Sequence, residues 1–343
     1  MSSPGFGLPL VTAVLLASLP SVSVWTNPKA SAAADAIPQP AAQFILRAFD
    51  THALVAIGEA HRNQQVHDFI LALVSDSRFA ERVDDIVVEF GAADHQDIID
   101  RFTEGQAVPP SELCRVWRDT VNILVWDAPV YERLFRAIRT VNQRRLDRRL
   151  RVLLADPPLD WTSIRHEEWQ RIAGTRDQFA AALVEREVLA KHRRALLIFG
   201  SGHVSRDTAF DAYGPVPDRH PNLAELVAAR HPGSIFLIWA HMAGWATRTV
   251  DPRFVTWTKP AVALLKGTWL GATNVGPPGQ SPTLEQLADG FLYLGPTRRL
   301  TVSKPAPQLY GDPMYLRELL RRDQIQGGFN ASELEQLRKT FLK

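Results

Sequence analysis

Five short apolar segments of this chain are each followed by an acid or a histidine, the residue types that transfer protons and bind metal ions. The segments and the polar residues that follow them are 53–57 with Glu59 and His61, 85–88 with Glu89, 152–155 with Asp156, 195–199 with His203, and 234–240 with His241. In an open parallel sheet, ligands bind beyond the carboxyl ends of the strands. We therefore expect these acids and histidines to converge at one edge of a sheet.

The segments have the composition of parallel strands that are buried on both faces. They are rich in Val, Ile and Leu and are flanked by Gly or Pro. The intervening stretches are long enough for helical crossovers. The sequence therefore predicts an α/β fold, an open and mostly parallel sheet with helices on both faces and an irregular C-terminal extension.

Apolar residues at helical spacing predict the helices around this sheet. The predicted helices cover 43–50, 66–74, 98–102, 129–141, 179–191, 223–229, 316–322 and 331–342. Two further strands are expected at 255–257 and 291–294. The stretch 111–128 fits no regular element; it is either a cap over the sheet edge or a packed excursion whose tryptophans fill core.

Two Gly-x-x-His motifs place histidines directly after predicted strands. Gly58 precedes His61, and Gly200 precedes His203. With Glu89, the two imidazoles form a set that binds Zn, Mn, Fe or Co and leaves positions open for water. Such a metal lowers the pKa of its bound water to about 7 and so supplies hydroxide. Without a metal, Glu59 or Glu89 can polarise a histidine that acts as general base.

Other residues near these motifs have supporting roles in this hypothesis. Asp156 would act as a further acid–base group or would support Glu59, Glu89 and the histidines. The alternative is structural, because an acid before two prolines also stabilises a turn. Arg62 and Arg118 are candidates for binding an anionic substrate, with solvent exposure as the alternative. His67, six residues after His61, is a further candidate for substrate binding.

The N-terminus has the composition of an export signal. Leu8 to Trp25 is free of charge, and small residues near Ala32–Ala34 offer a cleavage site. We expect a signal peptide over 1–34, a linker over 35–42 and one α/β domain over 43–343, with its core at 50–245 and an extension at 246–343. The sequence therefore predicts an exported protein, either periplasmic or secreted. The alternative is that the N-terminal segment is an uncleaved anchor. Past residue 40, no apolar stretch approaches the ~20 residues that span a bilayer.

Composition excludes several other classes. The 39 basic and 37 acidic residues give a net charge of +2, which provides no electrostatic footprint for nucleic acid. The single cysteine, Cys114, permits no intrachain disulfide and has no basic partner that the sequence identifies. The expected partner is a small-molecule or peptide substrate, and the sequence leaves the oligomeric state open.

The motifs resemble those of the superfamily that joins erythromycin esterases, ChaN-like haem-binding proteins and Tiki/TraB proteins. The resemblance covers about residues 53–206 and rests on Ile57–His61, 87–90 and 198–203. The stretch 58–63 with His67 is most similar to the ChaN-like branch. The first motif is one residue shorter than the G-E-x-x-H of erythromycin esterases.

The resemblance and the residues together leave three hypotheses. The first is an exported hydrolase of esters or amides that activates water at Glu59, His61, Glu89 and His203, with or without a divalent metal. The second is a haem or iron-compound binder without catalysis, with His61 or His67 as axial ligand and Trp117 and Trp126 as walls. The third is a vestigial site in an interaction module.

Overall fold

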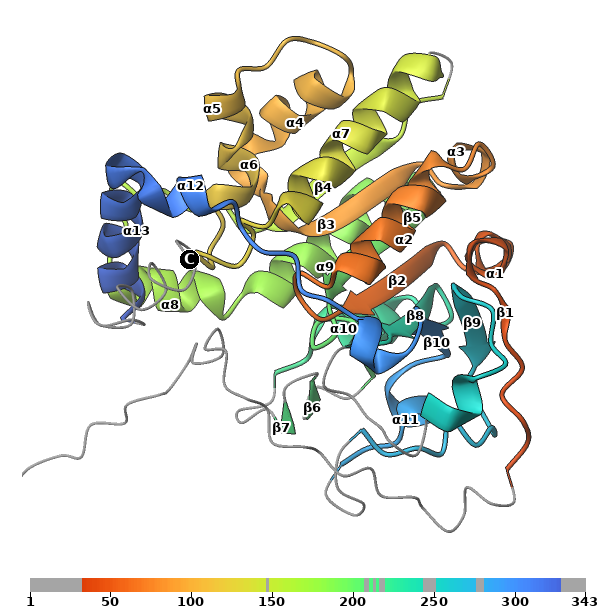
Figure 1. Ribbon diagram of the computed structural model, residues 1–343. Helices are drawn as coiled ribbons and strands as arrows, with labels where there is room; N and C mark the ends of the chain where they lie inside the picture. The colour runs from red at the N-terminus through yellow and green to blue at the C-terminus, as the bar shows by residue number, and fades with distance from the viewer. Residues whose placement is uncertain are drawn as a thin grey trace, which may run out of the picture.

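The computed structural model describes residues 33–145, 148–206, 210–211, 214–215, 220–242, 251–275 and 281–327. Helices surround an eight-stranded sheet (Figure 1). In spatial order its strands are β1 (Gln39–Pro40), β9 (Ala261–Leu264), β10 (Gly290–Tyr293), β8 (Ile235–Ala240), β2 (Leu54–Glu59), β5 (Ala195–Gly200), β3 (Asp85–Ala92) and β4 (Arg151–Asp156). The six strands from β10 to β4 are parallel. At one edge β9 pairs antiparallel with β10, and β1 pairs antiparallel with β9. The predicted fold class is confirmed.

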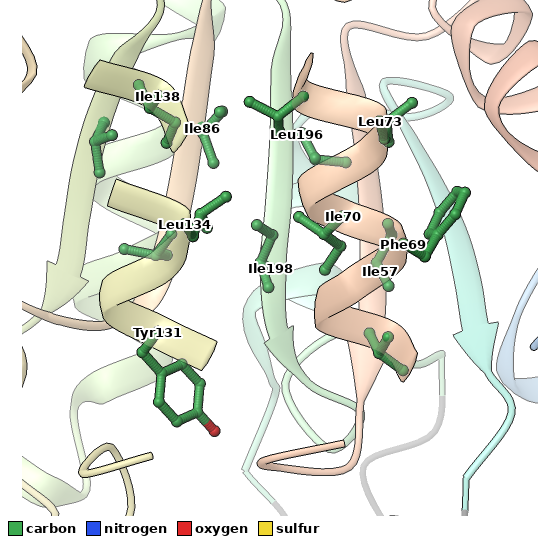
Figure 2. Close-up of a cluster of buried hydrophobic side chains, with 14 of the residues drawn as sticks. Ile57, Phe69, Ile70, Leu73, Ile86, Tyr131, Leu134, Ile138, Leu196 and Ile198 are labelled. Atoms are coloured by element: carbon green, nitrogen blue, oxygen red, sulfur yellow. The ribbon is translucent and has the colours of Figure 1, made fainter. Parts of the chain in front are cut away.

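Alternate residues of each central strand pack against helices on opposite faces of the sheet, as the two-residue period of a strand requires. One face carries α1 (Ala41–Ala48), α2 (Gln64–Ser75), α4 (Gln96–Thr103) and α7 (Pro129–Arg144). Figure 2 shows α2 and α7 lying over Ile57, Ile86 and Ile198 on this face. The other face carries α9 (Arg176–Glu187), α10 (Leu223–Arg230) and α11 (Leu284–Leu287). Every residue of β2, β5 and β8 is buried, and their sequences are apolar except at the carboxyl ends of β2, Gly58 and Glu59, and of β5, Gly200.

The spatial order of the strands determines what meets at the carboxyl edge. Strand β5 lies between β2 and β3, and Glu59 at the end of β2 is in register with Gly200 at the end of β5. Strand β4 lies beside β3, and its last residue, Asp156, pairs with Ala92. The ends of four parallel strands therefore lie side by side, with Gly200 in the middle.

The C-terminal part is more regular than the sequence predicted. Residues 246–343, expected to be an irregular extension, supply β9 and β10 to the main sheet. The strand predicted at 291–294 is β10, whereas the strand predicted at 255–257 is wrong. Those residues follow a 3₁₀ turn, Asp251–Phe254, and the side chain of Val255 is exposed. Part of the predicted linker also pairs with the sheet, since Gln39–Pro40 forms β1.

Three short helices add to the first face, because their apolar residues join its cluster: α3 (Phe79–Arg82), α5 (Pro110–Leu113) and α6 (Arg115–Arg118). Other described elements are α8 (His166–Ala173), α12 (Pro307–Gly311), α13 (Pro313–Gln326) and the short pair β6 (Phe210–Asp211) and β7 (Gly214–Pro215). A third apolar cluster joins α8 and α13 to the stretch 121–124. The predicted helix at 331–342 and nearly all of the predicted signal peptide lie outside the described residues. Within the described ranges, no helix is long and apolar enough to cross a bilayer.

Candidate active site

Glu59, the last residue of β2, is buried between two histidines. Its Oε1 lies 3.3 Å from Nδ1 of His61, and its Oε2 lies 2.8 Å from Nε2 of His67. Burial acts to raise the pKa of Glu59, but His67 and His61 outweigh it and hold the pKa below its ordinary value. Glu59 is therefore a carboxylate that accepts hydrogen bonds from both rings.

Local sequence explains why both histidines point at Glu59. Asn63 accepts hydrogen bonds from the N–H groups of Gln65 and Val66 and so caps the start of α2. His67 then lies in the first turn of this helix, fully buried against Tyr131, with ring centroids 4.9 Å apart. A hydrogen bond from Nδ1–H of His61 to Glu59 leaves the lone pair on Nε2.

The ring of His61 lies against the backbone of Gly200. A Cβ atom at Gly200 would lie 2.8 Å from Cε1 and 3.2 Å from Nε2 of His61, closer than side chains pack. On another side, the ring of Trp126 meets the His61 ring edge-on at a centroid distance of 4.6 Å. About a quarter of the His61 side chain is exposed. His61 is thus held in place while one part of its ring reaches solvent.

Glu89 links this histidine to the second one. Its Oε2 accepts the N–H of Gly200 at 2.6 Å, and its Oε1 lies 3.2 Å from Nε2 of His203 and 3.0 Å from Nη2 of Arg176. The Nδ1 of His203 lies 2.8 Å from Oδ1 of Asp177. Burial acts to lower the pKa of His203, but Asp177 and Glu89 outweigh it and raise the pKa to about 10. His203 is therefore an imidazolium at neutral pH.

The same contacts determine the charge on Glu89. Burial acts to raise its pKa, but His203, His61 and Arg176 hold it well below its ordinary value. Glu89 is therefore ionised, and it sits between two cations.

Asp156 lies behind this pair and contacts neither histidine in the interactions that the structure describes. Its Oδ1 accepts from Nε of Arg176 at 2.7 Å, and its Oδ2 accepts the backbone N–H of Val121. Burial raises the pKa of Asp156 despite the attraction of Arg176. Asp156 thus holds Arg176, which in turn holds Glu89.

The two candidate arginines, Arg62 and Arg118, both contact the stretch 119–128. The guanidinium of Arg62 donates to the backbone carbonyls of Val125, at 2.9 Å, and Leu124. The guanidinium of Arg118 lies over the ring of Tyr315, 4.5 Å from its centroid. The sequence predicted that both arginines bind substrate, and in the structure both guanidinium groups contact other parts of the protein.

His241 is placed away from this network in its described contacts. Its Nε2 lies 3.1 Å from Oγ1 of Thr297, and its ring stacks on Tyr293 at a centroid distance of 5.6 Å. Of the strand-end residues, Glu59, His61, Glu89, Asp156 and His203 therefore form one connected group, and His241 belongs to an aromatic cluster.

Sequence reasoning missed Arg176 and Asp177. It began the helix before β5 at residue 179, whereas α9 begins at Arg176. A crossover helix runs back along the sheet, so its first turn lies at the carboxyl edge of the strands. Arg176 and Asp177 are adjacent charged residues directly before the apolar part of this helix. This pattern was the signal that could have placed both residues at the carboxyl edge.

The contacts of the predicted metal ligands do not suit a metal ion. Both nitrogens of His203 are within hydrogen-bond distance of carboxylates, and both oxygens of Glu89 are also engaged. The Arg176 guanidinium already supplies positive charge to Glu89. Among the described residues, no group of three or more His, Cys, Asp and Glu side chains is placed to hold a metal ion. The contacts that the structure describes are hydrogen bonds and ion pairs between acids and bases.

The fold and these contacts define an α/β protein with a cluster of histidines and carboxylates at the carboxyl edge of its sheet. No family model and no curated protein sequence matches the chain. Solved structures of low identity do match, among them the following three. An erythromycin esterase mutant in its open conformation matches with a TM-score of 0.50 and 12% identity over 73% of this chain and 92% of that one.

The other two structures match less well. A protein from Bacillus cereus has a TM-score of 0.48 and 13% identity, over 77% of this chain and 92% of that one. The ChaN protein of Campylobacter jejuni, described with cofacial haem, has a TM-score of 0.36 and 11% identity, over 58% and 85% of the two chains. The match to the erythromycin esterase structure confirms the α/β fold that the superfamily resemblance predicts. A shared fold does not specify the reaction.

Proposed function

We propose that this protein is a hydrolase of esters or amides in which His61 activates water. One observation carries the proposal. Two histidines from different strand ends, each bonded to a carboxylate, meet at Gly200: His61 packs on Gly200, and Glu89 connects the Gly200 N–H to His203. The fold shared with an erythromycin esterase supports this class of reaction.

His61 is the general base in this proposal. Its Nε2 takes a proton from water as the oxygen attacks the carbonyl carbon of the substrate. Glu59, bonded to Nδ1–H, stabilises the imidazolium that forms. His67 keeps Glu59 in place from the buried side. Glu59 and His67 therefore position the base.

His203 supplies positive charge on the other side of Gly200. Both of its nitrogens are paired with carboxylates, so as an imidazolium it acts through its charge, which stabilises the developing oxyanion. The His61 imidazolium then gives its proton to the leaving oxygen or nitrogen as the bond to the carbonyl carbon breaks. Water is thereby split between the two products, and His61 returns to its neutral form. Arg176 and Asp156 keep Glu89 ionised and oriented toward His203.

A panel of chromogenic esters and anilides tests this proposal on the purified full-length protein. His61→Ala should lower kcat/KM by about 10²- to 10⁴-fold, the usual contribution of an acid–base group. His203→Ala should lower it by about 10²- to 10³-fold, the usual contribution of a group that stabilises an oxyanion. His231→Ala, at the exposed end of α10, is the matched control and should retain activity within about twofold. Activity that survives both site substitutions would refute the assignment.

The pH profile and the metal content provide two further checks. The activity should fall as the pH rises through about 10, because His203 then loses its proton. Dialysis against a chelator should leave the activity unchanged. A loss restored by Zn, Mn, Fe or Co would instead favour the divalent-metal site at His61, Glu89 and His203.

A second candidate function is haem binding at His61. The specific observation is that the His61 ring reaches solvent beside Trp126. His67 does not suit an axial ligand, since it is fully buried and bonded to Glu59. The other proposed wall, Trp117, is buried against Phe135. Titration with haemin should give a shifted Soret band that His61→Ala abolishes; the absence of a shift at micromolar protein would exclude this candidate.

We also propose that the protein is exported and acts on a small-molecule or peptide substrate. The apolar stretch before Lys29 and the small residues near Ala32–Ala34 support export with cleavage. N-terminal sequencing of the protein secreted from an expressing cell tests this. A first residue upstream of position 30 would contradict the proposed cleavage site.

A further inference from the structure

The C-terminal arm, residues 299–327, packs against the carboxyl edge of the sheet. It includes α12 and α13 and lies beside the stretch 119–128, here called the connector (Figure 1). Its apolar residues Tyr310 and Leu319 belong to a cluster with Val121, Ile123 and Leu124 of the connector. The arm and the connector therefore form one packed unit next to the candidate site.

The arm first contacts the turn that carries His61. The backbone N–H of Ser303 donates to the carbonyl of Arg62 at 2.7 Å, and the N–H of Gln64 donates to the carbonyl of Thr301 at 2.9 Å. Arg62 has a left-handed backbone, with φ of 66°. Such a conformation in a residue other than glycine persists only when its surroundings hold it. The arm is one of the elements that hold this turn.

A second contact joins the arm to Asp127 of the connector. The hydroxyl of Tyr310 donates to Oδ2 of Asp127 at 3.0 Å, and that of Tyr315 donates to Oδ1 at 2.7 Å. The Asp127 side chain is almost wholly buried, and the Arg118 guanidinium lies 3.6 Å away. Two hydroxyls and one cation thus compensate a buried carboxylate. We name this group, Asp127 with Tyr310 and Tyr315, the tyrosine clasp.

Two residues of the connector contact the site. Trp126, the neighbour of Asp127, packs on the His61 ring. Val121, at the other end of the connector, donates its N–H to Asp156, and its carbonyl accepts from Gln326 of the arm at 2.6 Å. The connector therefore touches the base through Trp126 and the Asp156–Arg176 pair through Val121.

We propose that Asp127, Tyr310 and Tyr315 are positioning residues for His61, and that the clasp holds the connector, with Trp126, against this base. The expected change in kcat rests on the proposed function. The expected change in the position of the His61 ring does not depend on any activity. It assigns a role to the C-terminal arm, which otherwise has none in the reaction.

The test removes the contacts between arm and connector while retaining the aromatic packing. The double variant Tyr310→Phe/Tyr315→Phe deletes both hydroxyls, and Arg322→Gln deletes the bonds from α13 to the carbonyl of Arg118, at 2.8 Å, and to Asp119. Arg321→Gln is the matched control, because Arg321 is the next residue of the same helix and bonds only to Glu318 in the described contacts.

Hydrogen exchange and the NMR signal of the His61 ring are measured with the kinetics. In the double variant the Val121 amide should exchange about 100-fold faster, since each hydroxyl bond to a carboxylate contributes about a factor of ten. The His61 Cε1–H resonance should shift, and kcat should fall about tenfold with KM within about threefold. Arg322→Gln should change each quantity in the same direction, and the control should match the wild type.

The outcomes separate the two proposals. If the wild-type protein hydrolyses nothing, the His61 resonance and Val121 exchange still test the clasp. A His61 resonance and a kcat that both match the Arg321→Gln control would overturn the clasp. Faster exchange with an unchanged His61 resonance would overturn it too, because the arm would then stabilise the connector without positioning the base.

Discussion

The substitution Gly200→Ala tests the central geometric claim, that His61 and Glu89 meet at this backbone. The added methyl carbon would lie 2.8 Å from Cε1 of His61, against about 3.4 Å for ordinary contact, so the ring must move by about 0.6 Å. Trp126 blocks movement on another side of the ring. Overpacking of this kind costs about 1–3 kcal/mol in unfolding free energy.

The displacement should have a larger effect on catalysis than on folding. A misplacement of about 1 Å can reduce a rate by about 10²-fold, so we expect kcat/KM to fall by about 10- to 100-fold. Urea denaturation measures the stability change, and ester hydrolysis measures the rate. Gly174→Ala is the control, because a Cβ there meets its nearest atom at 3.4 Å and the backbone is right-handed. If Gly200→Ala matches this control in both measurements, His61 does not lie where the structure places it.

Three further predictions concern the buried charges. His67→Ala should lower the unfolding free energy by about 2–4 kcal/mol, because Glu59 then loses a buried partner, and His67→Gln should recover part of the loss in urea denaturation. His203 has a pKa of about 10, above its ordinary value of 6.5, so its stabilisation is complete below about pH 6.5 and is lost as the pH rises to about 10. Asp177→Asn should flatten this decline in stability; an unchanged slope would show that the pair does not form. Arg176→Met removes the cation that two buried carboxylates share, so that Asp156 loses its ion-pair partner and Glu89 keeps only His203; it should cost about 3–5 kcal/mol by thermal denaturation, whereas a neutral effect would contradict the described ion pairs.

The sequence predicts best where burial dictates composition. Strands β2, β5 and β8 are buried on both faces, so each contains an apolar run, and these runs predict the strands. Helices with one apolar face, such as α2 and α7, are equally evident.

The failures occur where tertiary context overrides local composition. Val255 to Trp257 has strand-forming residues but forms a turn with Val255 exposed, while β9, a run of only four residues, was missed. Arg176 was missed because an arginine at the start of a helix usually lies in solvent. Only the folded chain shows that it is buried between two carboxylates.

The sequence by itself determined that Glu59, His61, Glu89, Asp156 and His203 lie at strand ends, since apolar runs mark the strands and parallel strands end at one edge. The tertiary structure decided which of them interact. Because β5 lies between β2 and β3, Gly200 stands between His61 and Glu89, and this order depends on contacts between residues more than 100 positions apart. The attachment of the C-terminal arm to Asp127 is likewise a long-range contact. Local composition does not predict which distant residues pair with each other.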